Sequence, residues 1–289
     1  MNLRGKKVLL TGASGFTGRY VEAELSTAGC EVVALQVDLR DSKALKTIGA
    51  VQPQVVIHLA ARAFVGHGSA NDFYDVNLIG TRNLLEALDT SGAPLQSVLL
   101  ASSANVYGNA AIRVLDESVP PAPANDYAVS KLAMEYMASL WRARLPLTIT
   151  RPFNYTGVGQ SESFLVPKIV AHFRRRDSVI ELGNLDVARD FSDVRFVASA
   201  YRALVETPAA VGEAVNICSG EVHSLADVVR MCEEITGHHI EVRVNPDFVR
   251  ANEVKVLKGD GSRLERLIGP LRRTAFRDTL KWMLTCLLY

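Results

Sequence analysis

Tyr127 and Lys131 carry the clearest chemistry in the sequence. They lie four positions apart in the segment Tyr-Ala-Val-Ser-Lys, so a helix would place both side chains on one face. An ammonium close to a phenol lowers the pKa of the phenol, which could then exchange a proton with a carbinol or ketone oxygen near neutral pH. The lysine could also hold the ribose of a nicotinamide cofactor. The pair could therefore support proton transfer, although this spacing is common in helices and a surface pair is the alternative.

Ser103 supplies a third polar group for the same reaction. It follows an apolar stretch, Ser97–Ala101, that predicts a buried strand. A hydroxyl at the carboxyl end of a parallel strand lies at the sheet edge where cofactors bind, so Ser103 could hydrogen-bond the substrate oxygen beside Tyr127. Ser102 is the alternative. Only one of the two is expected to face the site, because successive side chains along a strand point to opposite faces.

Gly12, Gly15 and Gly18 predict a phosphate-binding turn directly after the first expected strand. Gly12 would permit a tight turn, Gly15 would let the backbone approach a pyrophosphate, and Gly18 would let the following helix pack closely. The start of that helix offers free N–H groups and the positive end of its dipole to an anion. Such glycine patterns also arise by chance, but the position between a strand and a helix favours dinucleotide binding.

The sequence leaves open whether the cofactor is NADH or NADPH. NAD sites usually carry an acid at the end of the second strand, whereas this strand is expected to end at Gln36. Asp38 follows, and it either contacts the ribose or, in a shortened connection to the next strand, lies near the adenine. Arg19 and Arg40 could contact the 2′-phosphate of NADPH, although a plain surface position is the commoner outcome for such arginines.

The residues named above lie in a sequence in which strand and helix patterns alternate. These patterns predict an α/β fold, a Rossmann-type doubly wound parallel sheet with a smaller C-terminal substrate-binding lobe. In the first half, the expected strands are Val8–Thr11, Glu31–Gln36, Val55–Ala60, Ser97–Ala101 and Leu147–Thr150, and the expected helices are Arg19–Ala28, Asp75–Leu88 and Tyr127–Arg144. In the second half, they are strands Ser178–Leu182, Ala214–Ile217 and Glu241–Val244, and helices Val166–Arg176, Val194–Glu206 and Leu225–Thr236. The cofactor domain would span residues 1–155 with late returns near 190–220, and residues 156–289 would mostly form the lobe.

Composition narrows the class of protein. The chain has 289 residues, of which 48% are hydrophobic and 22% charged, with a formal net charge of +1. A near-neutral chain lacks the positive field of a nucleic-acid-binding protein. No apolar run reaches the roughly 18 residues that a membrane span needs, and no leader pattern precedes the first strand, so a cytoplasmic location is expected. The four cysteines form no C-x-x-C pair and the histidines lack zinc-ligand spacing, so no metal site is expected.

Six motifs together resemble one enzyme family. They are TGASGFTG (11–18), HLAA (58–61), SSANVYG (102–108), YAVSK (127–131), RPFNYTGVGQ (151–160) and NICSG (216–220). They cover nearly the whole chain and are similar to extended short-chain dehydrogenases/reductases that modify nucleotide sugars. The resemblance implies that Ser103 is the catalytic hydroxyl, with Tyr127 and Lys131 beside it. The residues that would then bind NADPH or NADH are Gly12, Gly15, Phe16, Thr17, Gly18, Asp38, Leu39, Leu59, Ala60, Ala61, Tyr127, Lys131 and Pro152.

Arg189 is the leading candidate for contact with a nucleotide sugar. It lies in the segment LGNLDVARDF (182–191), which is similar to a segment of GDP-mannose dehydratases and GDP-4-keto-6-deoxymannose reductases. Its guanidinium could clamp a diphosphate with paired hydrogen bonds. An internal ion pair with Asp186 or Asp190 is the alternative.

Five further residues complete the expected substrate contacts. Arg250 and Glu253 resemble a late R-x-x-E motif of the family, whose arginine meets the diphosphate and whose glutamate meets the nucleotide ribose. Asn105 and Asn154 would contact the substrate from their loops. Lys168 could reach a phosphate or the base, but a solvated lysine is an equal alternative.

Three reactions share this scaffold: 4,6-dehydration, 4-epimerisation and reduction of a 4-keto sugar. Dehydration needs a further acid–base pair, and the dehydratases of the family carry an Asp-Glu pair, or at least a Glu, just after the catalytic hydroxyl. This chain has Ala104 and Asn105 there. The short connection between the second and third strands resembles that of 4-keto-hexose reductases. The expected function is therefore NAD(P)H-dependent reduction of a nucleotide-activated 4-keto-6-deoxyhexose, with GDP as the nucleotide, to a GDP-6-deoxyhexose. An NAD-dependent nucleotide-sugar 4-epimerase is the alternative, and a dehydratase or a non-catalytic NADP-sensing protein is less favoured.

The helices expected at Asp75–Leu88 and Tyr127–Arg144 carry apolar residues beyond a single stripe, such as Met134, Met137 and Trp141. The family commonly packs the matching helices of two subunits into a four-helix bundle. The resemblance therefore predicts a homodimer.

Overall fold

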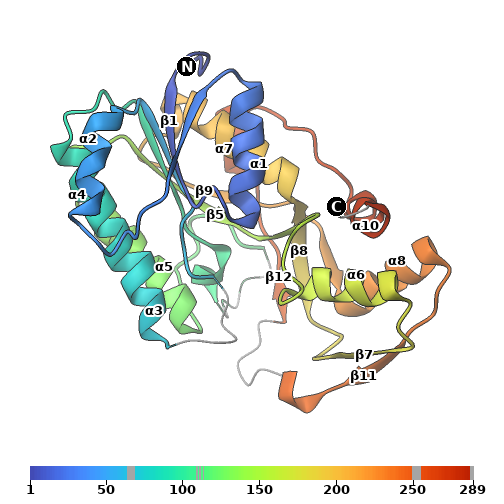
Figure 1. Ribbon diagram of the computed structural model, residues 1–289. Helices are drawn as coiled ribbons and strands as arrows, with labels where there is room; N and C mark the ends of the chain where they lie inside the picture. Colours follow the sequence, from blue (N-terminus) through green and yellow to red (C-terminus); the bar gives the residue numbers. More distant parts are fainter. Residues whose placement is uncertain (64–68, 109, 111, 113, 249–254, 287–289) are drawn as a thin grey trace.

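A sheet of six parallel strands forms the centre of the protein (Figure 1). The computed structural model describes residues 1–289 apart from 64–68, 109, 111, 113, 249–254 and 287–289. The strand order is β2-β1-β3-β4-β5-β9, and every neighbouring pair is parallel. The strands are β1 (Lys7–Thr11), β2 (Glu31–Leu35), β3 (Val55–His58), β4 (Ser97–Ala101), β5 (Leu147–Pro152) and β9 (Ala214–Ile217).

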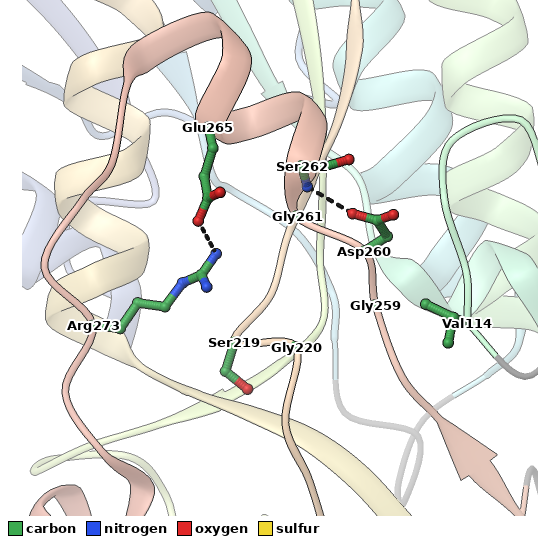
Figure 2. A pocket seen from close by; sticks show the side chains of 9 residues that line it. All are labelled: Val114, Ser219, Gly220, Gly259, Asp260, Gly261, Ser262, Glu265 and Arg273. Atoms are coloured by element: carbon green, nitrogen blue, oxygen red, sulfur yellow. Dashed lines mark hydrogen bonds and ion pairs between the residues drawn. The ribbon is translucent and has the colours of Figure 1, made fainter.

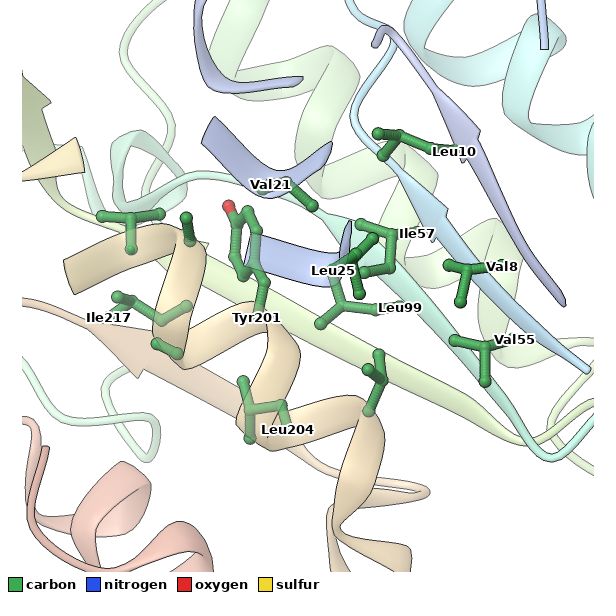
Figure 3. Packing of buried hydrophobic residues seen from close by; sticks show 14 of the residues in the cluster. Val8, Leu10, Val21, Leu25, Val55, Ile57, Leu99, Tyr201, Leu204 and Ile217 are labelled. Carbon is green, nitrogen blue, oxygen red and sulfur yellow. The ribbon is translucent and has the colours of Figure 1, made fainter. Parts of the chain in front are cut away.

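Helices cover both faces of this sheet, which explains why its strands are continuous apolar runs. They are α1 (Phe16–Thr27) and α7 (Val194–Glu206) on one face, and α4 (Thr81–Thr90) and α5 (Asp126–Ser139) on the other. Figure 3 shows the first of these cores, where Leu10 of β1 lies with Leu25 of α1 and Tyr201 of α7. The preceding residue, Leu9, enters the second core with Leu84 of α4. The predicted doubly wound α/β sheet is therefore confirmed.

The strand order places the ligand-binding edge between β1 and β3. β2 lies on one side of β1 and β3 on the other, and ligands of open α/β sheets bind where the order reverses in this way. Between β2 and β3, where every residue's backbone is described, the chain forms only η1 (Ala44–Thr47) and α2 (Ile48–Val51). No strand is inserted there, so the shortened connection considered for Asp38 is the one observed.

Two helices differ from the sequence prediction. The expected helix Asp75–Leu88 begins as a π-helix, η2 (Tyr74–Gly80), and becomes α-helical only in α4. A π-helix is uncommon and often marks a functional site. The expected helix Tyr127–Arg144 is α5, which ends at Ser139. Beyond it, backbone hydrogen bonds between residues three apart turn the chain and bury Trp141.

The second half of the chain adds a smaller lobe beside the main sheet (Figure 1). One of its sheets has the order β10-β8-β12 with β6 paired to β8, and β7 pairs with β11. These strands are β6 (Asn154–Thr156), β7 (Val179–Leu182), β8 (Ala188–Asp193), β10 (Val222–Ser224), β11 (Glu241–Val244) and β12 (Val256–Leu257). A separate apolar core joins the helices α6 (Leu165–Arg175), α8 (Leu225–Thr236) and α10 (Phe276–Thr285). In the described part of the chain, no helix is both long and apolar enough to cross a membrane.

β8 has no strand pattern in the sequence, because it reads Ala-Arg-Asp-Phe-Ser-Asp. Its two carboxylates are nevertheless buried, and each is hydrogen-bonded. Asp190 accepts from the amides of Ser219 and Gly220, and Asp193 caps α7 by accepting from the amide of Arg195. Buried carboxylates with such partners are tolerated in a strand, but sequence periodicity does not reveal them.

Candidate active site

The turn between β1 and α1 needs glycine at two positions for steric reasons. Gly12 has a φ of +72°, and a Cβ there would lie 2.7 Å from the amide nitrogen of Ala60. A Cβ on Gly18 would lie 2.1 Å from the carbonyl oxygen of Gly12. At Gly15 the nearest atom would be 3.2 Å away, so the fold itself constrains this position less. Gly15 is the N-cap of α1, and because it has no side chain this helix end can accept an anion.

Tyr155 of β6, in the lobe, contacts the same turn. Its hydroxyl lies 2.8 Å from Thr17 Oγ1, in the first turn of α1. Its ring stacks on Phe16, with 6.3 Å between ring centroids and 12° between the planes. Two expected cofactor residues, Phe16 and Thr17, are thus in direct contact with a tyrosine that follows Asn154 in the sequence.

The segment after β3 is fastened to the glycine turn through Thr11. The hydroxyl oxygen of Thr11 accepts hydrogen bonds from the amides of Leu59 and Ala60, at 3.2 and 3.1 Å. The amide of Leu59 also donates to the carbonyl oxygen of Thr11 at 3.3 Å, and β3, which was expected to reach Ala60, ends at His58. Leu59, Ala60 and Ala61 are half-buried there, beside the turn that they are expected to serve.

Asp38 follows β2 and pairs with Arg40. The Arg40 guanidinium donates to both carboxylate oxygens, at 2.6 to 3.1 Å, and lowers the pKa of Asp38 to about 2. Both side chains are about half exposed, so the pair is accessible at this edge of the sheet. The neighbouring Leu39 is buried. Arg19, the other arginine considered for a phosphate, donates to the carbonyl oxygen of Gly159 at 3.2 Å.

Tyr127 and Lys131 lie four residues apart on α5 and so on one face of that helix. Asn125 caps α5 by accepting a backbone hydrogen bond at 2.9 Å, which fixes the turn that carries Tyr127. Lys131 Nζ donates to the carbonyl oxygen of Ala101, at the end of β4, at 2.7 Å. Phe73, from α3 (Asn71–Phe73), meets the Tyr127 ring edge to face, with 6.0 Å between centroids.

Ser102 and Ser103 point to different sides of the strand end. The Ser103 oxygen accepts from the amide of Asn105 at 3.2 Å, and the Ser103 hydroxyl acts on the pKa of Tyr127 through a hydrogen bond. Ser102 instead donates to Glu135 Oε1 at 2.5 Å in the interior. Of the two serines considered for the site, Ser103 is the one beside the phenol.

The pKa values of the Tyr–Lys pair differ from the sequence prediction. Burial raises the pKa of Tyr127 to about 12, and the hydrogen bond with Ser103 only partly opposes that rise. Burial also lowers the pKa of Lys131 to about 8, with the charge of Glu135 acting in the opposite direction. The expected lowering of the Tyr127 pKa is therefore wrong for this structure. Desolvation of the phenolate dominates, and the lysine ammonium is engaged with the Ala101 carbonyl.

A network of hydrogen bonds between buried side chains stabilises the site from the interior of the protein. Arg151 forms a bidentate pair with Glu135, with N–O distances of 3.0 and 2.6 Å, and both side chains are less than a tenth exposed. Arg151 also donates to the hydroxyl of Tyr107 at 3.0 Å, and that hydroxyl donates to Asn216 at 2.8 Å. The network joins α5, β5 and β9. It holds the helix that carries Lys131 against the strand ends.

Arg189 lies on β8 in the lobe, where its guanidinium donates to two backbone carbonyl oxygens at 3.0 and 3.4 Å. The two carboxylates considered as its partners have other contacts. Asp186 pairs with Lys255 at 2.9 Å, and Asp190 accepts from the Ser219 hydroxyl at 2.6 Å. These two carbonyl oxygens belong to Ala188, on the strand next to β6, and to Lys255, just before β12.

The other expected substrate residues are spread over the lobe and the sheet edge. Asn154 begins β6 and pairs with β8, which brings it one strand away from Arg189. Lys168 of α6 donates to the carbonyl oxygen of Glu181 at 2.8 Å and lies 4.4 Å from the ring centre of Phe248. Burial lowers the pKa of Lys168, which is half-buried.

Asn105 is exposed beside Ser103. Pro152, an expected cofactor residue, is buried at the carboxyl end of β5. The predicted residues Arg250 and Glu253 lie outside the described residues.

Comparison with known proteins identifies the family. A sequence model described as the NAD dependent epimerase/dehydratase family matches residues 8–218. The chain belongs to this family. Among relatives of this chain, GDP-6-deoxy-D-talose 4-dehydrogenase of Aggregatibacter actinomycetemcomitans is 35% identical, and the alignment covers 96% of both chains. GDP-6-deoxy-D-mannose reductase of Pseudomonas aeruginosa is 32% identical over 97% of this chain and 96% of the relative.

A solved structure of the family carries a nicotinamide cofactor. The structure of RMD from Pseudomonas aeruginosa complexed with NADPH has a TM-score of 0.88 to this chain, with 30% identity and 97% of both chains covered. The protein is thus an NAD(P)-dependent enzyme of the extended short-chain dehydrogenase/reductase type. Its own residues fit such a cofactor, because the glycine turn leads into the N-terminus of α1 at the point where the strand order reverses.

A hollow in the protein is lined by none of the residues described above as catalytic or cofactor-binding (Figure 2). It is lined by Val114, Ser219, Gly220, Gly259, Asp260, Gly261, Ser262, Glu265 and Arg273. Its polar groups bond one another: Asp260 accepts from the amide of Ser262 at 2.7 Å, and Arg273 pairs with Glu265 at 2.9 Å. None of these described residues is a predicted site residue, so we assign the hollow no part in the chemistry.

Three residues of this site escaped the sequence analysis. Glu135 lies four positions after Lys131, so helical spacing could have placed it on the same face. Arg151 and Tyr155 lie in the motif RPFNYTGVGQ, which was read for Asn154 and Pro152 alone. Their partners come from distant parts of the chain, and no local pattern reveals such contacts.

Proposed function

We propose that the protein is an NAD(P)H-dependent reductase of a nucleotide-activated 4-keto-6-deoxyhexose, with GDP as the nucleotide. The observation that carries this proposal is that Ser103, just after β4, forms a hydrogen bond with Tyr127 of α5, while Ala104 and Asn105 follow Ser103 in the sequence. The pair can serve a sugar oxygen, whereas neither following side chain can titrate and support dehydration. The names of the two relatives, a GDP-6-deoxyhexose dehydrogenase and a GDP-6-deoxyhexose reductase, support oxidation or reduction of a GDP sugar.

The side chains have distinct roles in this proposal. A bound reduced nicotinamide supplies a hydride to C4 of the sugar. Tyr127 gives its phenolic proton to the C4 oxygen, and Ser103 hydrogen-bonds the same oxygen. A pKa of about 12 keeps Tyr127 protonated at neutral pH, which is the form that reduction requires. Lys131 would hold the nicotinamide ribose with its ammonium.

Further residues would bind the two ligands. The turn from Gly12 to Gly18 would hold the pyrophosphate of the cofactor, with Asp38 and Leu39 near the adenine and the segment 59–61, together with Pro152, lining the rest of its site. Arg189 would meet the diphosphate of the sugar nucleotide. The remaining proposed substrate contacts are Asn105, Asn154, Lys168, Arg250 and Glu253.

The proposal is tested with the purified protein and 4-keto-6-deoxy sugar nucleotides carrying GDP, UDP or dTDP. We expect NADPH or NADH absorbance to fall with the GDP substrate, and NMR of the product gives its configuration at C4. The Tyr127→Phe variant should lose about 10²- to 10⁴-fold in turnover, because it lacks the proton donor, yet bind the cofactor as the wild type does. Unchanged turnover in this variant would remove Tyr127 from the reaction.

The alternative activity is a 4-epimerase. It would appear as tightly bound NAD in the purified protein, together with interconversion of sugar nucleotides without added reductant. A protein that binds the cofactor but acts on none of these sugars would instead be a non-catalytic NADP sensor.

We also propose a homodimer formed through α5 and the helix before it. Exposed apolar side chains lie at Val129 and Tyr136 of α5 and at its C-cap residue, Leu140, and they are 38%, 66% and 72% exposed. Their spacing places them on one helical face. Ile79 at the end of η2 is 44% exposed. Large apolar residues this exposed on neighbouring helices support a subunit interface.

A further inference from the structure

His58, the last residue of β3, is a buried histidine that the proposed chemistry does not use. Its ring lies between two threonine hydroxyls. Nδ1 is 2.7 Å from Thr11 Oγ1, and Nε2 is 2.8 Å from Thr81 Oγ1. Thr11 leads into the glycine turn, and Thr81 follows the π-helix η2, which packs against α5. The imidazole therefore joins the phosphate-binding turn to the helices beneath the catalytic residues.

The neighbouring bonds fix the direction of each hydrogen bond. Thr81 donates its one hydroxyl proton to the carbonyl oxygen of Asn77 at 2.8 Å, so its oxygen must accept from Nε2–H of His58. The Thr11 oxygen already accepts from two backbone amides, and its proton is available for Nδ1. The network thus assigns a neutral ring with its proton on Nε2. Burial, followed by the charge of Lys131, lowers the pKa of His58 to about 3, which agrees with a neutral ring.

Asn77 carries the connection on to the catalytic helix. Its amide nitrogen donates to Ser130 Oγ and to the carbonyl oxygen of Arg62, both at 3.0 Å, and its oxygen accepts from the amide of Arg62 at 2.8 Å. Ser130 donates in turn to the carbonyl oxygen of Tyr127 at 2.8 Å. The side chains that form this connection are all buried, so a group that loses its partner bears the cost of desolvation.

We propose that His58 is a positioning residue, whose neutral imidazole holds the glycine turn and the Asn77 segment at a fixed separation and so sets where Tyr127 stands relative to the cofactor turn. Small misplacements of reacting groups lower rates steeply, so this role affects turnover as well as folding. The inference rests on the proposed role of Tyr127 as the proton donor.

The tautomer can be read directly in the wild-type protein. NMR of protein labelled with ¹⁵N-histidine should give one ring that is protonated at Nε2 alone, with shifts that do not change over the stability range of pH. Comparison with the His58→Asn variant assigns the signal. A proton on Nδ1, or a charged ring at neutral pH, would overturn the proposal.

Two substitutions at His58 test the positioning role. His58→Phe keeps a ring but no hydrogen bonds, and we expect kcat to fall at least tenfold and the Kd for NADPH to rise by about tenfold. His58→Gln keeps an amide donor and acceptor and should recover part of both losses. His238→Asn is the matched control, because His238 is a half-buried histidine bonded to the carbonyl oxygen of Asp177 in the lobe, and both constants should stay at wild-type values.

Ser130→Ala tests the far end of the connection. It removes the link to Tyr127 without touching the glycine turn, so kcat should fall while the Kd for NADPH stays the same. A folded His58→Phe protein with wild-type kcat and Kd would overturn the proposal. If that variant does not fold, the tautomer of His58 in the wild-type protein and the kcat of Ser130→Ala still test the proposal. The tautomer and the Kd do not depend on the sugar, so their failure is distinct from a failure of the proposed reductase activity.

Discussion

Burial governs the chemistry of Tyr127 and Lys131 more than their charges do. The phenol, with a pKa of about 12, is a proton donor at neutral pH, and the lysine, with a pKa of about 8, is still mostly an ammonium there. Glu135, bonded to Arg151 and Ser102, is the group that keeps the lysine charged. The pH behaviour of the enzyme should therefore depend on a carboxylate that contacts no ligand.

The pH profile of reduction tests this dependence on Glu135. We expect kcat/KM to fall as the pH rises through about 8, because Lys131 then loses the proton with which it would hold the cofactor. Glu135→Gln removes the negative charge that raises the Lys131 pKa, so the fall should move to lower pH. Steady-state rates across this range, at a temperature where both proteins are folded, provide the measurement. An unmoved profile would show that Lys131 is not the group that titrates.

The free energy of unfolding should also depend on the protonation of Lys131. The pKa of Lys131 is lower in the folded chain than in the unfolded chain, so the buried charge destabilises the fold below about pH 8. As the pH rises from about 8 towards about 10.5, the folded state loses this proton first and stability increases. Lys131→Met should be inactive and more stable at pH 7 by about 2 kcal/mol, after allowing for the lost bond to Ala101. Urea unfolding at neutral and alkaline pH gives the comparison, and the variant should lack the wild-type gain at high pH.

At the residue scale, spacing alone was enough to select Tyr127 and Lys131, whereas the choice of Ser103 over Ser102 came from the family resemblance. Spacing could not give their pKa values, since these depend on how much protein surrounds each group. The pairing of Glu135 with Arg151 was also invisible, because it joins a helix to a strand that are separate in the sequence.

At the scale of elements, two glycines of the same turn should have different roles. We expect Gly18 to be needed for the turn to fold, whereas we expect Gly15 to be needed for the cofactor to bind. A methyl on Gly18 would meet backbone atoms of Gly12 and Ala13 at 2.1 to 2.7 Å, which cannot move without opening the turn. Gly18→Ala should therefore lower the free energy of unfolding by roughly 3 kcal/mol or more, as overpacked sites do.

Gly15→Ala is the matched variant in the same turn. Its methyl would lie 3.2 Å from the nearest atom, so we expect near-wild-type stability and weaker NADPH binding. Thermal unfolding and cofactor titration of both variants supply the data. Equal loss of stability in the two would mean that Gly15 also serves packing.

Elements with a continuous apolar pattern, such as β1 and β4, could be predicted from the sequence. The π-helix η2 could not, since its register depends on Asn77 bonding the distant backbone of Arg62 and the side chain of Ser130. β8 was missed for a related reason, because tertiary contacts to Asp190 and Asp193 take the place of apolar burial.

At the scale of the whole molecule, the proposed dimer depends on the exposed face of α5. Leu140→Glu combined with Tyr136→Lys should convert the dimer to a monomer, because both changes place charges on the apolar face. Val244→Glu is the control, since Val244 is 54% exposed but lies in the lobe, on β11, which pairs with β7. Sedimentation velocity would measure the mass. A wild-type protein that is already monomeric would contradict the proposal.

The contact between Tyr155 and Thr17 has a consequence for how the two ligands communicate. Thr17 belongs to the turn proposed for the pyrophosphate, while Tyr155 lies on β6, whose partner β8 bears Arg189. A nucleotide that shifts the threonine hydroxyl would thus also shift the strands proposed to bind the sugar, so each ligand should change the affinity of the other by the same factor.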